Sequence, residues 1–135
     1  MKILIQGNRT ISEIQKDFSD LFPFLKIEFF SKPHSSGAGS SKNSIQDHDI
    51  QLSKLGLDQR EGDFEVLPEM TVSEFEQGIL KFFGLSVQVF RKTDHHSWLE
   101  TTDTDNWTLE KQNQTGKDWM EMRINPEKKE EIDYD

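Results

Sequence analysis

Two segments of the chain carry apolar residues at intervals of three or four positions, the spacing that places them on one face of an α-helix. The segments begin at Thr10 and Thr71, and TISEIQKDFSDLF in the first is matched by TVSEFEQGILKFF in the second. Each opens with Thr-x-x-Glu, the pattern of a capping box, in which both side chains satisfy amide groups of the first helical turn. We expect the first helix to end before Pro23 and the second at Gly84.

Each predicted helix lies between two segments in which apolar and polar residues alternate, the pattern of a half-buried β-strand. KILIQ and LKIEFF flank the first helix, and DFEVL and LSVQVF flank the second. Across the helices and the strands that follow them, seven of 21 aligned positions are identical. The sequence therefore predicts a β-α-β unit that occurs twice, at residues 1–32 and 62–92.

Two β-α-β units in one small domain favour an α+β fold of ferredoxin-like type, an antiparallel four-stranded sheet with both helices on one face. In that arrangement the first strand of each unit is central and the second lies at an edge. WLETT is expected to add a fifth strand beside the edge strand of the second unit. A C-terminal helix should follow, capped by Asp103, Thr104 or Asp105 and weakened by Gly116.

The chain of 135 residues is expected to form a single domain over residues 1–124. Residues 33–61 are rich in serine and glycine in their first half, which predicts a long, partly disordered linker between the units. Residues 93–124 hold the added strand and helix. Residues 125–135 are mostly charged, with an excess of acids, and predict a disordered tail.

The second half of the chain resembles a small, uncharacterised family of bacterial proteins. The resemblance rests on the segments MTVSEFEQGILKFFGLSVQVFRK, WLETT and NWTLEKQN. It implies no activity, cofactor or catalytic residue for this chain.

Charge limits the classes of partner. Sixteen basic and 25 acidic side chains give a formal net charge of −9, which repels phosphate backbones and anionic lipid surfaces. The absence of cysteine excludes disulfides and thiolate metal sites. The N-terminus does not read as a signal peptide and no apolar run has the length of a transmembrane helix. We therefore expect a cytoplasmic protein that binds neither nucleic acid nor membrane.

The histidines give little sign of a metal site. His95 and His96 are adjacent at a predicted turn, where neighbouring side chains diverge rather than share one ion. His34 and His48 lie in the linker and would join a site only if the linker folded over the core. No metal is predicted.

Acidic and glycine-rich segments also favour structural roles. Asp103, Asp105 and Glu110 cluster around the start of the last helix, where acids commonly cap the helix and complement its dipole. SGAGSSKNS lacks the Gly-Lys-Ser/Thr of a phosphate-binding loop. No catalytic residue or cofactor is predicted, and whether the protein is an enzyme is left open, with a non-catalytic role favoured.

The sheet face away from the helices carries large apolar side chains among polar ones. Leu4 and Leu67 come from the first strands of the units, Phe30 and Phe90 from the second strands, and Trp98 from the fifth strand. An exposed patch of this kind is typical of an interaction surface, unless the last helix covers it. The sequence therefore predicts a protein-interaction or adaptor module that binds a protein partner or a second copy of itself.

Two other functional classes remain open. One is a small-molecule- or metal-binding protein or a small enzyme, with a pocket between the sheet and the linker. The other is an acidic mimic of nucleic acid that occupies a basic nucleic-acid-binding protein.

Overall fold

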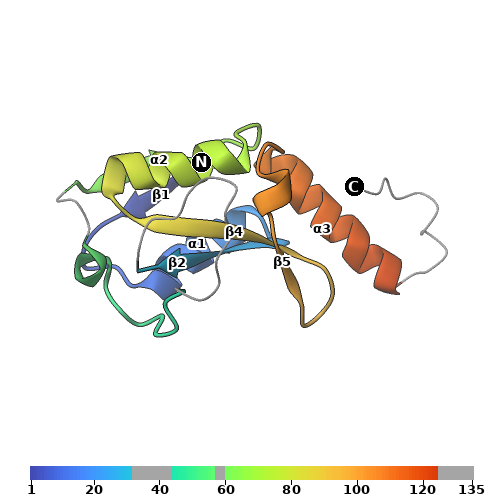
Figure 1. Ribbon diagram of the computed structural model, residues 1–135, viewed down its shortest axis with the longest axis horizontal. Coiled ribbons are helices and arrows are strands. Elements are labelled where there is room, and N and C mark those ends of the chain that lie inside the picture. The colour runs from blue at the N-terminus through green and yellow to red at the C-terminus, as the bar shows by residue number, and fades with distance from the viewer. Residues whose placement is uncertain (32–43, 57–59, 125–135) are drawn as a thin grey trace.

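The computed structural model describes residues 1–31, 44–56 and 60–124, and it confirms the α+β class (Figure 1). The strands are β1 (Lys2–Ile5), β2 (Leu25–Phe30), β3 (Gly62–Glu65), β4 (Ser86–Lys92) and β5 (Trp98–Glu100). The α-helices are α1 (Ile11–Leu21), α2 (Val72–Phe83) and α3 (Leu109–Ile124), and the short 3-10 helices are η2 (Leu52–Leu55) and η3 (Thr102–Thr104). The linker residues 32–43 and 57–59 and the predicted tail lie outside the described residues.

The described strands form two antiparallel sheets, with the orders β1–β3 and β2–β4–β5. This differs from the expected single four-stranded sheet with both helices on one face, in which β2 and β4 would lie at opposite edges. Here β2 pairs with β4 along its whole length, and the ferredoxin-like arrangement is not confirmed. Alternation of apolar residues fixes which side chains point inward, but it does not fix which strand lies beside which.

Both capping boxes are present as predicted. The Thr10 and Thr71 N–H groups each donate to a carboxylate oxygen of the glutamate three residues later, at 2.9 Å. The Glu13 and Glu74 N–H groups donate back to the threonine hydroxyls, at 3.3 and 3.0 Å. α1 ends with Phe22 as its C-cap, and α2 ends at Gly84, whose φ of 72° favours glycine.

The fifth strand is confirmed and the C-terminal helix begins later than expected. β5 pairs antiparallel with β4, so β4 lies between two strands. The Thr108 hydroxyl accepts a hydrogen bond from Lys111 N–H at 3.0 Å and caps α3, whereas the expected caps lie in or beside η3. Gly116 does not split α3, which is continuous from Leu109 to Ile124. A Cβ atom at Gly116 would lie only 2.9 Å from Cβ of Phe24. The glycine therefore permits close packing of α3 on the chain just before β2.

One core cluster joins both β-α-β units. The inward residues of all four predicted unit strands are buried, and so are most apolar residues of α1 and α2, with Phe82 exposed. The most completely buried large side chains are Phe18, Phe29, Phe75, Ile3, Ile5, Ile11, Ile14, Leu25, Ile27, Leu52, Leu85 and Leu109. Leu52 belongs to the predicted linker, so part of that segment contributes to the core.

The linker segment after β2 docks on the start of α1. Backbone hydrogen bonds join Ile11 N–H to Ile50 O, Ser12 N–H to His48 O, Leu52 N–H to Arg9 O and Ser53 N–H to Gly7 O, at 2.8–3.0 Å. Residues Thr10 and Gln51 form an isolated antiparallel bridge. Residues 48–53 are thus tied to the first β-α-β unit.

The segment after β5 docks on the start of α2 in the same way. Backbone hydrogen bonds join Val72 N–H to Trp107 O, Ser73 N–H to Asp105 O, Leu109 N–H to Met70 O and Glu110 N–H to Pro68 O, at 2.8–3.0 Å. Thr71 and Thr108 form the matching bridge. The duplication therefore extends past the β-α-β units, and we refer to residues 1–55 as the first copy and residues 62–111 as the second copy.

Candidate functional site

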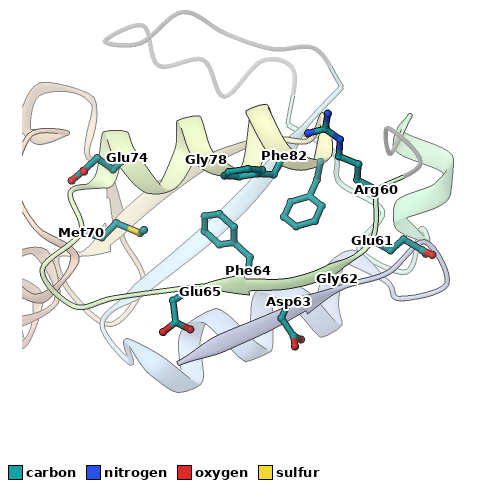
Figure 2. Close-up of a pocket in the computed structure, with 11 residues that line it drawn as sticks. Arg60, Glu61, Gly62, Asp63, Phe64, Glu65, Met70, Glu74, Gly78 and Phe82 are labelled. Atoms are coloured by element: carbon teal, nitrogen blue, oxygen red, sulfur yellow. The ribbon is translucent and has the colours of Figure 1, made fainter.

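A groove of about 920 Å3 lies between β3 and α2 (Figure 2). Its apolar surface comes from Phe64 on β3 and from Phe82 and Phe83 on α2, together with Met70 and Gly78. Its other lining residues are Arg60, Glu61, Gly62, Asp63, Glu65 and Glu74. The groove thus has an aromatic interior, and four acidic residues and one arginine lie around it, with the Asp63 and Glu65 side chains pointing away from α2 (Figure 2).

Aromatic packing shapes the groove. The Phe64 ring points from β3 toward α2, with its centroid 6.0 Å from that of Phe83 and 6.4 Å from that of Phe82. A Cβ atom at Gly78 would lie 2.8 Å from Cζ of Phe64, so the glycine allows this ring to approach the helix. The Phe82 side chain is 48% exposed, which leaves an aromatic face available at the groove.

β3 presents a free backbone edge beside this groove. Val66 N–H donates to Met1 O, so Met1 and Val66 are a hydrogen-bonded pair. Such pairs alternate along an antiparallel ladder, so Ile3–Phe64 and Ile5–Gly62 are the next hydrogen-bonded pairs between β1 and β3. The N–H and C=O groups of Asp63 and Glu65 therefore point to the other edge of β3. No second strand pairs with that edge in the described part of the chain.

Negative charge surrounds the free edge. Glu61 accepts a hydrogen bond from Gly7 N–H at 2.6 Å, and a Glu65 carboxylate oxygen lies 3.6 Å from the N-terminal amine. The Thr71 N–H and hydroxyl groups lower the pKa of the Glu74 carboxyl below its ordinary value of 4.5, so this side chain is ionised at neutral pH. The arrangement offers apolar surface, peptide groups and negative charge, which are means of recognising a partner.

The residues expected to form an apolar patch are not all exposed. Leu4 and Leu67 are 37% and 39% exposed, and Trp98 is partly exposed, but Phe30 and Phe90 are only 4% and 9% exposed. The expectation of an exposed patch that includes the two phenylalanines was therefore wrong. Leu4 and Leu67 lie on the side of the β1–β3 sheet, whereas Phe30, Phe90 and Trp98 belong to the β2–β4–β5 sheet.

Both phenylalanines have neighbours among the described residues. Lys26 Nζ lies 5.4 Å from the centroid of the Phe90 ring, and Phe30 forms a bridge with Ser44 of the segment beside β2. α3 does not cover Phe90, because it reaches β4 through the neighbouring Arg91, whose side chain points to the opposite face. Trp98 is flanked by ammonium groups of Lys26 and Lys92 at 4.9 and 4.8 Å from its ring centroid.

The histidine and acidic candidates do not converge on one place. His95 and His96 are exposed in the turn before β5, where His96 N–H donates to Asp94 Oδ1 at 2.8 Å. His48 Nε2 lies 3.2 Å from Glu28 Oε1, and His34 lies outside the described residues. Among the side chains that the structure describes, no three of His, Asp and Glu are grouped so as to hold a metal ion.

Comparison of the chain with family models, with curated proteins and with solved structures finds no match. The resemblance to a bacterial family accordingly stays a prediction. Within the described ranges, none of the helices has both the length and the apolar character needed to cross a membrane.

Sequence reasoning missed the groove, although one signal was present. An isolated glycine inside a helical pattern, such as Gly78, often marks close packing of a neighbouring group. The 48% exposure of Phe82 is known only from the structure. The glycine has no meaning as a signal until β3 is known to lie beside α2 with a free edge.

Proposed function

We propose that the protein is a non-catalytic interaction module that binds an extended segment of a partner protein in the groove between β3 and α2. The observation that carries this proposal is the free edge of β3, which lies beside an aromatic groove. A strand added to a sheet edge gains backbone hydrogen bonds, and pockets for its alternate side chains give specificity. Both means of recognition are present here within one site.

The register of β3 indicates how such a segment would bind. The peptide groups of the bound segment would pair with the N–H and C=O groups of Asp63 and Glu65. Alternate side chains would then point toward α2, where Phe64 and Phe82 offer apolar contacts. Strand β5 also has an edge without a paired strand among the described elements, but it is only three residues long.

Charge selects the class of partner. With four acidic residues and one arginine around the groove and a net charge of −9 for the chain, a basic segment is favoured over an acidic one. Pairing of β3 with β3 of a second copy would bring the carboxylates of Asp63 and Glu65 near their equivalents, which is unfavourable. The same charges disfavour nucleic acid.

The experiment is a selection from a phage-displayed library of random peptides on the full chain, followed by titration of the isotope-labelled protein. We expect amide shifts at Asp63, Glu65 and Gly78. Phe82→Glu should abolish binding, whereas Leu99→Glu should not. Phe82 and Leu99 are equally exposed, at 48%, so the two variants are a matched pair for stability. Peptides that bind both variants equally, or that shift other regions only, would refute the proposal.

A small-molecule ligand is the second candidate, because the groove volume falls within the range of about 300–1,000 Å3 that is typical of ligand sites. A thermal-shift screen of metabolites tests it. A compound that stabilises the wild type and the Leu99→Glu variant, but not the Phe82→Glu variant, would favour this candidate over peptide binding.

A further inference from the structure

The groove has a counterpart in the first copy, and the two differ at the positions that matter for binding. Adding 61 to a residue number in the segment from β1 to α1 gives the equivalent residue in the segment from β3 to α2. By this offset nine lining residues of the groove have equivalents in the first copy, and five of them matter here: Phe64 corresponds to Ile3, Glu65 to Leu4, Met70 to Arg9, Glu74 to Glu13 and Gly78 to Asp17.

In the first copy, an arginine of the chain itself occupies this place. Arg9 Nη1 donates to the carbonyl oxygen of Leu4 at 2.9 Å and to Asp17 Oδ2 at 2.8 Å. Arg9 Nε lies 3.9 Å from Glu13 Oε2, and the arginine side chain is 19% exposed. Since Leu4 faces Asp63 between two hydrogen-bonded pairs, its carbonyl group points to the edge of β1 away from β3. The guanidinium group therefore satisfies the outer edge of β1.

In the second copy, two of the three acceptors remain but the donor is missing. The Glu65 carbonyl group points to the outer edge of β3, as that of Leu4 does on β1. Glu74 keeps the carboxylate of Glu13. Met70, at the position of Arg9, has no hydrogen-bond donor in its side chain, and Gly78 removes the carboxylate that fixes the arginine in the first copy. The place that a guanidinium group fills in one copy is thus an open groove in the other.

We propose that the groove of the second copy binds an arginine side chain of the partner segment, placed as Arg9 is placed in the first copy. The proposal rests on the function proposed above and names its anchor residue. The guanidinium group would donate to the Glu65 carbonyl oxygen and face the Glu74 carboxylate.

The other differences between the copies suit the same ligand. Phe64 and Phe82 stand where the first copy has Ile3 and Leu21. Aromatic faces stack on a planar guanidinium group, and the excess of acidic residues around the groove attracts its charge. Lysine lacks the planar fork, so it can satisfy fewer of these acceptors at once.

Peptides from the selection described above provide the first test. We expect one arginine at a constant position in the peptides that shift Glu65 and Gly78. Replacement of this arginine by lysine should weaken binding about tenfold, and replacement by alanine should weaken it further, because hydrogen bonds to a charged group are lost. Peptides that bind in the groove but tolerate alanine at every position would overturn this inference and leave the proposed function standing. Failure to select any groove-binding peptide would overturn both.

A protein variant provides the second test. Met70→Arg supplies the guanidinium group from the chain itself, so it should occupy the groove and weaken binding of the same peptides about tenfold. Met70→Leu supplies neither a charge nor a hydrogen-bond donor and should bind them as the wild type does. Equal affinity of the wild type and the Met70→Arg variant would contradict the inference. If Met70→Arg does not fold, the peptide substitutions still decide the question.

Discussion

The polar contact between α3 and the rest of the fold gives the sharpest stability prediction. Gln112 is fully buried, and its Oε1 atom accepts a hydrogen bond from Arg91 Nη1 at 3.1 Å. Its Nε2 atom donates to the carbonyl oxygen and the hydroxyl of Thr104 at 2.9 and 2.8 Å. Gln112→Met keeps the length of the side chain and removes all three hydrogen bonds.

The expected loss follows from these partners. A hydrogen bond to a charged group contributes about 1.5–3 kcal/mol and a neutral one about 1 kcal/mol. Thr104 is partly exposed and can bind water instead, while Arg91 retains its contact with the Trp107 ring, whose centroid is 5.5 Å from Arg91 Cζ. We therefore expect Gln112→Met to lower the free energy of unfolding by about 2–4 kcal/mol.

Urea unfolding followed by circular dichroism measures this change, provided that the denaturant dependence stays constant. Gln114→Met is the control, because Gln114 is exposed on the same helix and its side chain bonds only to Asp118 Oδ1, at 2.8 Å. The control should change stability by less than about 0.5 kcal/mol. Equal effects of the two substitutions would show that the buried network does not hold α3 in place.

Three further substitutions test other parts of the argument. Leu52→Ala should lower the free energy of unfolding by about 2–5 kcal/mol, since Leu52 is fully buried; a negligible loss in a urea titration would mean that its segment is only loosely attached. Gly116→Ala should lower the melting temperature. A new Cβ atom 2.9 Å from Phe24 costs about 1–3 kcal/mol, whereas the gain in helix propensity is about 1 kcal/mol. A higher melting temperature would refute the close packing. Glu74→Gln should make the free energy of unfolding less dependent on pH in acid. Hydrogen bonds from Thr71 lower the pKa of the Glu74 carboxyl in the folded protein below 4.5. The ionised carboxyl therefore stabilises the fold above pH 4.5, and this stabilisation is lost as the pH falls through the folded pKa. Parallel acid titrations of wild type and variant, followed by circular dichroism, would contradict this if the two curves had the same slope.

The local elements were predictable because their signals are local. Thr10 and Thr71 each stand three residues before a glutamate, and Gly84 and Pro23 follow the helix ends. The alternation of apolar residues located the four strands of the two units as well as β5. The start of α3 was misjudged because several residues before Thr108 are also good caps, and only the docking of residues 105–110 on α2 selects among them.

The pairing of strands and the site could not be predicted in the same way. Phe30 and Phe90 alternate correctly for an outer sheet face, yet both are buried, at 4% and 9% exposed. The second part of the duplication escaped notice because HDIQLSK and DNWTLEK share only a leucine and a lysine. The two segments are equivalent in their backbone hydrogen bonds, and many different side chains are compatible with these bonds.

The exchange of strands between the copies has a consequence for folding. β1 pairs with β3 and β2 pairs with β4, so the backbone hydrogen bonds of Ile3 depend on Phe64, and Ile27 lies opposite Val89. Neither copy can complete a sheet alone, and the pairing partners are far apart along the chain. Contacts of this range slow folding and make it cooperative. Although the sequence reads as two repeats, the molecule is expected to lose both sheets in a single transition, without an intermediate in which one copy stays folded.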